Sequence, residues 1–428
     1  MKQYKYPNPT EYSTLLQRPG RDSEQLRNTA ESIFSEVQRN GDQAVQKYTA
    51  LFDGVTLDGM RVSKEAIEKA TSGVPEVLRK AMQVAYQNIS TFHEAQQTET
   101  LRVETQAGVL CWQEKRPIEA VGIYIPGGSA PLFSTVFMLA IPAQLAGCKR
   151  IVLCSPPSSK GTIAPEILYA ANLCGVTEIF SVGGIQAIAA LTLGTAQLPK
   201  VDKIFGPGNS YVTAAKQVAT RYGVAIDMPA GPSEVLVFAD DTAIPEYVAA
   251  DLLSQAEHGA DSQVILVSTS EKLLDQVQLE VAAQVEQLPR KEVATKALQH
   301  SKAILVANNT EALSVINMYA PEHLILAVRD ARTVASEVQH AGSVFLGNYT
   351  PESAGDYASG TNHTLPTYGF ARQYSGVSLD SFLKSITFQE ITKEGLLALG
   401  PHVACMAAAE GLTAHQRAIE IRLRNDKK

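Results

Sequence analysis

The chain has 428 residues, 45% of them hydrophobic, so it can bury a large core spread over roughly two to four domains. Its 37 Lys and Arg residues are outnumbered by 44 Asp and Glu residues, which gives a net charge of −7, and no basic run or arm occurs. Nothing in this balance favours a nucleic acid or an anionic membrane surface as a partner.

The cysteines and the apolar segments limit where the chain can reside. Five cysteines without a CxxC spacing argue against a disulfide framework or a cysteine-rich zinc site, and they favour a reducing compartment. The N-terminus lacks the apolar run of a signal peptide, and the longest apolar stretch, residues 131–148, is broken by polar residues and proline. We therefore expect a cytoplasmic protein without a membrane span.

The first part of the chain is predicted to be helical. Residues 1–20 carry three prolines and no clear period, which indicates an arm or a small appendage. From about residue 23 to residue 97, apolar residues recur at helical spacing, with breaks at residues 41–42 and 73–75. This pattern predicts an all-α lead-in.

From Ala120 onward, short apolar strands alternate with helices. The strands are expected at residues 120–126, 150–154, 178–182, 203–205, 234–238, 263–267, 303–306, 324–327 and 343–346. Runs that are apolar on both faces, with helices between them, are typical of parallel sheets covered on each side. These strands are too many for one open sheet, so we expect two sheets, with a boundary near residues 227–232.

Three further segments are distinct in composition. Residues 270–300 read as a polar hairpin with helical character, and residues 395–423 read as a helical tail. Residues 348–375 are rich in Gly, Tyr and Ser and lack a period, which predicts a long ordered loop. Long loops inside compact domains are usually functional.

Four glycine-dense loops follow or precede the predicted strands, at residues 126–129, 182–185, 205–209 and 230–234. Ligands of α/β folds bind at the carboxyl ends of strands, where glycine lets the backbone approach a phosphate. None of the four is a GxGxxG or a Walker sequence. Each alone is more simply a tight turn, but together they favour a binding surface.

Residues 251–259 place several groups that can bind a metal or a proton within two helical turns. Gln255 and His258 are three residues apart and share a helical face. Asp251 can cap a helix and Gly259 can end one. The simpler alternative is a histidine that stabilises the negative end of a helix dipole.

The remaining histidines divide into surface candidates and site candidates. His93, His300 and His340 occur in polar helical surroundings and are expected at the surface. Glu322 and His323 open a buried strand, where they are either two bases or a solvated glutamate and a core-edge histidine.

Two more pairs are candidates. Asp356 and His363 lie in the predicted loop, where Asp356 is either a cation ligand or a turn former. Glu410 and His415, five residues apart in the tail, need not share a helical face. Spacing therefore suggests a metal-containing enzyme for small molecules but leaves its ligand set open.

Five strings, at residues 205–209, 227–234, 254–259, 321–324 and 355–363, together resemble the histidinol dehydrogenase family. The resemblance extends from about residue 20 to the C-terminus. It implies oxidation of L-histidinol through L-histidinaldehyde to L-histidine, with two NAD⁺ and one Zn²⁺ per subunit. It also implies a homodimer in which the C-terminal tail completes the partner's site.

The resemblance assigns roles to particular residues. It implies that zinc is held by Gln255, His258, Asp356 and His415. It implies that Glu322 and His323 are the catalytic bases. It implies substrate contacts from Ser233, Gln255, His258, His323, Asp356, His363, Glu410 and His415, and NAD⁺ contacts from Tyr124, Gln186 and Asn209.

The resemblance also implies an α/β fold with two incomplete Rossmann-like parallel-sheet domains, a helical N-terminal lead-in and small appendages at both ends. On that basis, residues 1–20 form an arm, and residues 21–119 with 235–375 form a first domain that carries the metal and the bases. Residues 120–234 form an NAD-binding domain, and residues 376–428 form a helical tail that crosses to the dimer partner.

The chemistry of these residues agrees with this assignment, and alternative functions remain to be compared with it. Histidine suits removal of a hydroxyl proton near neutral pH, and Glu322 suits activation of the water that must add to the aldehyde. A zinc-dependent amide hydrolase would not need four glycine-dense loops, and a catalytically inactive nucleotide-binding module should lack some of these groups. A thiohemiacetal on Cys111 or Cys148 is a further alternative, although neither has a visible acid–base partner.

Overall fold

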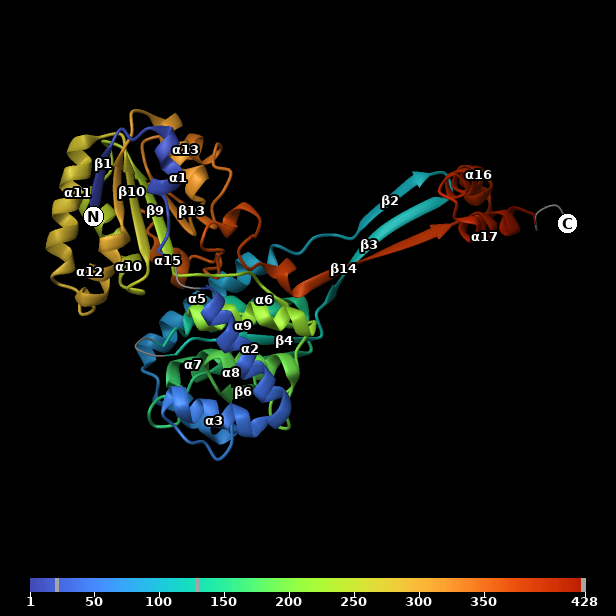
Figure 1. Cartoon of the computed structure of the whole chain (residues 1–428), viewed down its shortest axis with the longest axis horizontal. Helices are drawn as coiled ribbons and strands as arrows, with labels where there is room; N and C mark the ends of the chain where they lie inside the picture. The colour runs from blue at the N-terminus through green and yellow to red at the C-terminus, as the bar shows by residue number, and fades with distance from the viewer. Residues whose placement is uncertain (20–22, 128–130, 425–428) are drawn as a thin grey trace. The chain divides into compact units, whose positions relative to one another are not determined.

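The computed structural model describes residues 1–19, 23–127 and 131–424 and is drawn in Figure 1. These residues divide by their contacts into two compact units. The first comprises Met1–Gln96 and Ile118–Phe382, and the second comprises Gln97–Pro117 and Leu383–Lys428. Residues 128–130, in the first of the predicted glycine loops, lie outside the described residues.

A six-stranded, entirely parallel sheet forms one half of the first unit. Its order is β1-β11-β10-β9-β12-β13, from β1 (Lys2–Lys5), β9 (Glu234–Ala239), β10 (Gln263–Ser268), β11 (Lys302–Leu305), β12 (His323–Ala327) and β13 (Ser343–Leu346). One face packs on α10 (Pro245–Ala256), α11 (Glu271–Val285) and α12 (Lys291–His300). The other packs on α1 (Tyr12–Leu15), α13 (Asn309–Tyr319) and α14 (Ala331–Ala335); Figure 1 labels α1 and α13 beside this sheet.

A five-stranded parallel sheet forms the other half. Its order is β6-β5-β4-β7-β8, from β4 (Ala120–Tyr124), β5 (Arg150–Ser155), β6 (Glu178–Ser181), β7 (Lys203–Phe205) and β8 (Ala225–Ile226). One face packs on α4 (Lys64–Gly73), α5 (Glu76–Glu94), α6 (Ser134–Ala146) and α7 (Pro165–Leu173). The other packs on α2 (Ser23–Asn40), α3 (Asp42–Asp53), α8 (Gly184–Leu193) and α9 (Ser210–Ala219).

The two sheets share one topology. Numbered along the chain from β4 and from β9, the strands of each sheet run in the order 3-2-1-4-5, with β1 added at the edge of the larger sheet. This is the order of a Rossmann half, whose direction of winding reverses between its first and fourth strands. The predicted fold class, two incomplete Rossmann-like parallel sheets, is confirmed.

The strands follow the hydrophobic pattern closely, but three predictions for the first hundred residues differ from the structure. Residues 1–20 are not a separate arm, because Lys2–Lys5 pairs with β11 and Tyr12 is buried on the larger sheet. The lead-in helices, which we grouped with the larger sheet, pack on the smaller one. His93 is buried, because its Nδ1 contacts the Ile89 carbonyl at 2.8 Å and its Nε2 contacts Asn362 at 3.3 Å.

The segment predicted as a loop at residues 348–375 contains a short helix, α15 (Glu352–Tyr357), and one 3-10 turn at Phe370–Arg372. Other 3-10 turns lie at Pro9–Glu11, Thr220–Tyr222 and Leu379–Phe382. Among the described helices, none combines the length and the hydropathy that a bilayer span would need.

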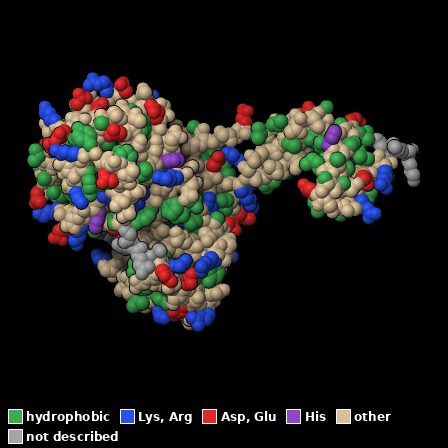
Figure 2. All heavy atoms as spheres, turned by 45° about the horizontal axis from the view of Figure 1, so that its top comes forward, with side chains coloured by type: hydrophobic (Ala, Val, Ile, Leu, Met, Phe, Trp, Pro, Cys, Tyr) green, Lys and Arg blue, Asp and Glu red, His purple; other side chains and the backbone are tan. Residues whose placement is uncertain are grey.

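The second unit is built from an antiparallel sheet and two helices. The sheet order is β14-β3-β2, from β2 (Leu101–Gln106), β3 (Val109–Pro117) and β14 (Leu383–Ile391), and the helices are α16 (Lys393–Ala409) and α17 (Thr413–Arg424). The helical tail was predicted, but the three strands were not. Figure 2 shows hydrophobic side chains on the surface of this unit. Met406 and Ile421 are among its exposed hydrophobic residues.

Candidate active site

The candidate site lies between the amino ends of β9 and β12 and the loops that follow β4 and β7. A cavity of about 300 Å³ is lined from one side by Pro207 and Asn209 and from the other by Ser233 and His258. A smaller cavity of about 70 Å³ is lined by Gly206, Ser233, Glu322 and His363, among others. Both sheets therefore contribute to one recess inside the first unit.

Glu322 and His323 are both buried at the amino end of β12. Glu322 Oε2 accepts a hydrogen bond from the backbone N–H of Glu234 at 2.9 Å, and His323 Nδ1 lies 3.3 Å from the carbonyl oxygen of the same residue. Burial raises the pKa of Glu322 to about 8. Burial opposes charge on His323 too, but the surrounding carboxylates, Glu352 foremost, raise the pKa of the ring well above its usual range.

Two carboxylates from α15 face the His323 ring. His323 Nε2 lies 3.3 Å from Asp356 Oδ1, and Nδ1 lies 3.9 Å from Glu352 Oε1. Burial disfavours charge on Asp356, but the adjacent ring outweighs it and lowers the pKa of the carboxyl. Burial raises the pKa of Glu352 well above its usual range. One ligand atom from each of His323, Glu352 and Asp356 lies within 4.8 Å of the others, which makes this a group that can hold a metal ion.

Gln255 is completely buried near the end of α10 and contacts the same cluster. Its amide is assigned so that the nitrogen donates to Glu352 and the oxygen accepts from the backbone N–H of Glu234 at 3.0 Å, because only this orientation satisfies both groups. His258 follows just beyond the helix. His258 is exposed at the edge of the larger cavity, but the protein around it removes enough water that desolvation lowers the pKa of its ring.

His363 spans the two halves of the unit. Its Nδ1 contacts the carbonyl oxygen of Asp356 at 2.7 Å, and its Nε2 contacts Thr135 Oγ1, on α6, at 3.0 Å. Desolvation lowers the pKa of His363, which keeps the ring neutral near pH 7. Ser233 lies on the wall of both cavities.

The three residues predicted to contact NAD⁺ lie on the smaller sheet. Tyr124 ends β4 and accepts a hydrogen bond from the Gly184 N–H at 3.1 Å, and the buried Gln186 donates to Asp53 at 3.4 Å. The exposed Asn209 caps α9 by accepting from two backbone N–H groups.

The neighbouring loop requires glycine at position 206. Gly206 has φ +126°, and a Cβ there would lie 2.2 Å from the Tyr124 carbonyl oxygen. This close approach holds the loop after β7 against the end of β4. The two strands flank the point at which the winding direction of the sheet reverses, the usual place for a nucleotide in this fold.

Glu410 and His415 belong to the second unit, where both are exposed. Two predictions from the sequence need correction. Asp251 lies inside α10 and cannot cap it; instead it accepts a hydrogen bond from the backbone N–H of Glu352, at the start of α15. Asp356 lies on that helix rather than in a loop.

Sequence reasoning missed three residues that contact the site: Arg18, Glu234 and Glu352. Glu352 lies four residues before Asp356, so a predicted helix would have placed both on one face. No comparable signal exists for Arg18, because its partner Glu234 is 216 residues away.

The cysteine alternative is weak in this structure. Cys111 lies on β3 of the second unit, and Cys148 contacts the Phe382 carbonyl oxygen at 3.9 Å. Burial raises the pKa of the Cys148 thiol to about 11, which disfavours the nucleophilic thiolate near neutral pH.

Comparison with known proteins identifies the family. The family model described as histidinol dehydrogenase matches residues 16–423. The chain belongs to the histidinol dehydrogenase family. It is 56% identical to histidinol dehydrogenase from Bacteroides thetaiotaomicron over 423 residues, which cover 99% of both chains. It is 53% identical to histidinol dehydrogenase from Escherichia coli over 412 residues, which cover 96% of this chain and 94% of the relative.

Solved structures agree. The crystal structure of histidinol dehydrogenase from Elizabethkingia anophelis matches with a TM-score of 0.98 at 55% identity and covers 100% of this chain and 99% of that one. Histidinol dehydrogenases are NAD-dependent dehydrogenases, so this chain is one too. The amide hydrolase and the inactive nucleotide-binding module are thereby set aside.

Proposed function

We propose that the chain catalyses the four-electron oxidation of L-histidinol through L-histidinaldehyde to L-histidine, with reduction of two NAD⁺ and with one zinc ion per subunit. The observation that carries this proposal is the buried Glu322–His323 pair, which lies beside buried groups that can bind a metal and opposite Rossmann-type loops. An acid–base pair, a cation site and a nucleotide surface are the three parts that this reaction needs.

A zinc ion suits the unsatisfied atoms of the site. Glu352 Oε2 and Asp356 Oδ1 are buried carboxylate oxygens without hydrogen bonds, which is costly unless a cation or a ligand satisfies them. We assign the zinc to Gln255, His258 and Asp356, with His415 supplied by a second copy of the chain. When bound, zinc would act as a Lewis-acid clamp for the imidazole and amine of the substrate, and a neutral Gln ligand leaves it more net positive charge than a carboxylate would.

In the first oxidation, His323 is the base. Its Nδ1 faces the Glu234 carbonyl oxygen at 3.3 Å, and its Nε2 lies 3.3 Å from Asp356 Oδ1. A cation held by Asp356 would neutralise that carboxylate, which would lower the pKa of the His323 ring and let a neutral Nε2 take the hydroxyl proton of the substrate. As that proton leaves, hydride passes from the carbinol carbon to the first NAD⁺, and the aldehyde forms.

In the second oxidation, a water molecule must first add to the aldehyde, because hydride leaves only a tetrahedral carbon. Glu322 takes the proton of this water while its other oxygen keeps the hydrogen bond from Glu234. His323 then takes a hydroxyl proton of the hydrate, hydride passes to the second NAD⁺, and the carboxylate of histidine results.

The other predicted residues bind the two ligands in this scheme. Ser233, His363 and Glu410 contact the substrate together with the bases and the metal ligands, and Tyr124, Gln186 and Asn209 contact NAD⁺. We accordingly assign NAD⁺ binding to residues 120–234, and the metal and the bases to residues 235–375.

A homodimer is part of the proposal. No residue of α17 is buried, and α16 buries only three residues although much of its sequence is apolar. Leu397, Met406, Leu412 and Ile421 are all at least 44% exposed. A second copy that covers these side chains would remove apolar surface from water, and Glu410 and His415 would then enter its site.

The direct test is to mix the purified protein with L-histidinol and NAD⁺ and to follow reduced nicotinamide and histidine together. About two reduced cofactors per histidine are expected from the two hydride transfers. Protein stripped of metal by a chelator should lose the activity and regain it with zinc. Absence of reduction by the zinc-loaded protein would refute the proposal.

A further inference from the structure

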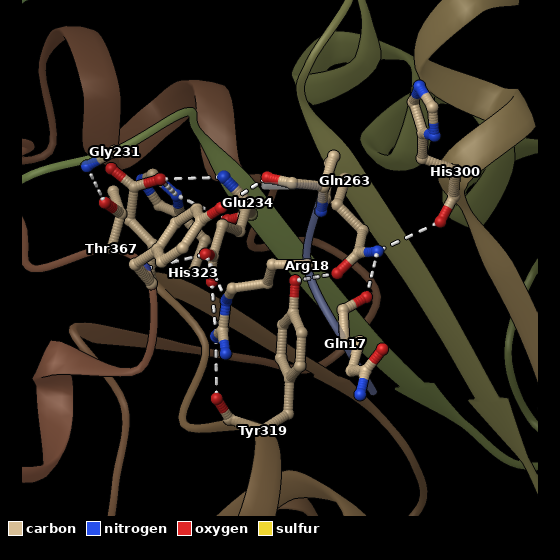
Figure 3. Close-up of polar contacts among 12 residues, drawn as sticks. Gln17, Arg18, Gly231, Glu234, Gln263, His300, Tyr319, His323 and Thr367 are labelled. Atoms are coloured by element: carbon tan, nitrogen blue, oxygen red, sulfur yellow. Dashed lines mark hydrogen bonds and ion pairs between the residues drawn. The ribbon is translucent and has the colours of Figure 1, made fainter. Parts of the chain in front are cut away.

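Arg18 and Glu234 form a buried ion pair between the N-terminal segment and the start of β9 (Figure 3). Arg18 Nε lies 2.5 Å from Glu234 Oε1, and Arg18 Nη2 lies 2.7 Å from Oε2, so the contact is bidentate. Arg18 Nη2 also donates to the Tyr319 carbonyl oxygen at 2.7 Å, and the guanidinium stacks 4.0 Å from the Tyr319 ring centroid. The Glu234 carboxylate accepts a third hydrogen bond, from the backbone N–H of Tyr368. A planar guanidinium with this many hydrogen-bond and stacking partners is held in one orientation.

The backbone of Glu234 holds the two bases. Its N–H donates to Glu322 Oε2 at 2.9 Å and to the Gln255 amide oxygen at 3.0 Å, and its carbonyl oxygen lies 3.3 Å from His323 Nδ1. One residue therefore sets the position of Glu322 and orients the His323 ring through its contact with Nδ1. A displacement of this peptide moves both bases together.

We propose that Arg18 is a positioning residue for catalysis: by clamping the Glu234 side chain, it fixes the backbone that aligns Glu322 and His323. The inference rests on the proposed roles of those two bases. Arg18 itself touches no reacting atom. Loss of the Arg18 side chain would also leave the nearly inaccessible Glu234 carboxylate without the charge that neutralises it.

The perturbation is Arg18→Ala, compared with Arg18→Lys, which keeps the charge but loses the planar fork. Leu15→Ala is the matched control: Leu15 is buried in α1, packs in the same apolar cluster as Tyr319 and has no charge to pair with Glu234. We expect Arg18→Ala to lower kcat by about 100-fold, the order of loss that follows an ångström-scale misplacement of reacting groups. KM for NAD⁺ should stay within about twofold, because Tyr124, Gln186 and Asn209 lie on the other sheet.

Chemical rescue adds a readout that a purely structural role would not move. Millimolar guanidinium should restore part of kcat to Arg18→Ala, whereas it should leave Leu15→Ala unchanged. Arg18→Lys, which is the variant to use if Arg18→Ala does not fold, should lose about fivefold to tenfold in kcat, since one charge without two aligned donors only partly restores the clamp.

The proposal is overturned if folded Arg18→Ala or Arg18→Lys keeps kcat within twofold of wild type. It is also overturned if Leu15→Ala, at an equal loss of Tm, reduces kcat as much as Arg18→Ala. Failure of the proposed function is distinguishable from failure of the Arg18 proposal, because the wild-type protein itself would then not reduce NAD⁺ with L-histidinol.

Discussion

Glu322→Gln is the substitution that separates the two oxidations. The amide is nearly isosteric, and its oxygen can still accept the hydrogen bond that Glu322 Oε2 receives from the Glu234 N–H at 2.9 Å. The start of β12 and the adjacent His323 therefore keep their places. What disappears is a buried group that can take a proton from water.

The expected loss follows from the role of a general base. Positioned acid–base groups contribute roughly 10²–10⁴ in rate, which corresponds to about 3–5 kcal/mol of transition-state stabilisation. We expect this loss in the conversion of aldehyde to histidine and at most about a tenfold loss in the oxidation of the alcohol. Because burial raises the pKa of Glu322 to about 8, the wild-type aldehyde step should rise with pH toward a plateau above that value. A bound cation would move the midpoint to lower pH.

The assay measures each half-reaction from its own substrate. With L-histidinol, Glu322→Gln should release about one reduced nicotinamide per alcohol consumed and accumulate aldehyde, and with L-histidinaldehyde it should turn over slowly. Equal losses in both half-reactions would refute the division of labour between Glu322 and His323. Unchanged rates in both would remove Glu322 from the mechanism altogether.

Three further predictions address the metal, the thiols and the ionisation of the nucleotide side. His415→Asn should lose zinc, measured by elemental analysis of the purified protein, because one of four ligands is removed. Cys111→Ser and Cys148→Ser should each keep their steady-state activity, because neither thiol serves the reaction. Burial raises the pKa of Asp53 from 3.8 to about 6, so ionisation of this carboxyl lowers the free energy of unfolding of the wild type as pH rises through that interval. With the effect reduced for the partial exposure of the side chain, Asp53→Asn should exceed the wild type by about 1 kcal/mol in free energy of unfolding in urea at pH 7.5. The two proteins should be equally stable near pH 3.5.

Each prediction has a control or a contrary outcome. His402→Asn, another exposed histidine of the second unit, should keep its zinc, and full metal retention by His415→Asn would contradict the ligand assignment. Loss of activity in Cys148→Ser without loss of Tm would support a mechanism that passes through a thiohemiacetal on this cysteine. A stability difference for Asp53→Asn that does not change between pH 3.5 and pH 7.5 would show that the carboxyl titrates normally.

The sequence by itself determined the strands and their class. Each predicted strand from residue 120 onward appears within about two residues of its expected bounds, because a strand buried on both faces must be apolar along its whole length. Division into two sheets followed from the number of strands, and the helical pattern located α10 with Gln255 near its end. The strands of the antiparallel sheet were missed: in β2 only Leu101 and Val103 alternate with polar residues, and the whole strand is exposed, so its apolar pattern is too short to indicate a buried strand.

Only the tertiary structure decided which distant groups meet. His93 looked like a surface residue because its neighbours in sequence are polar, but Asn362, 269 residues away, closes over it. Glu234 read simply as the first residue of a strand, yet its backbone supports Glu322, His323 and Gln255, and its side chain is held by Arg18. Local periodicity indicates which face of an element is buried. The partner of a buried charge depends instead on which distant segments the fold brings together, and no local pattern encodes that.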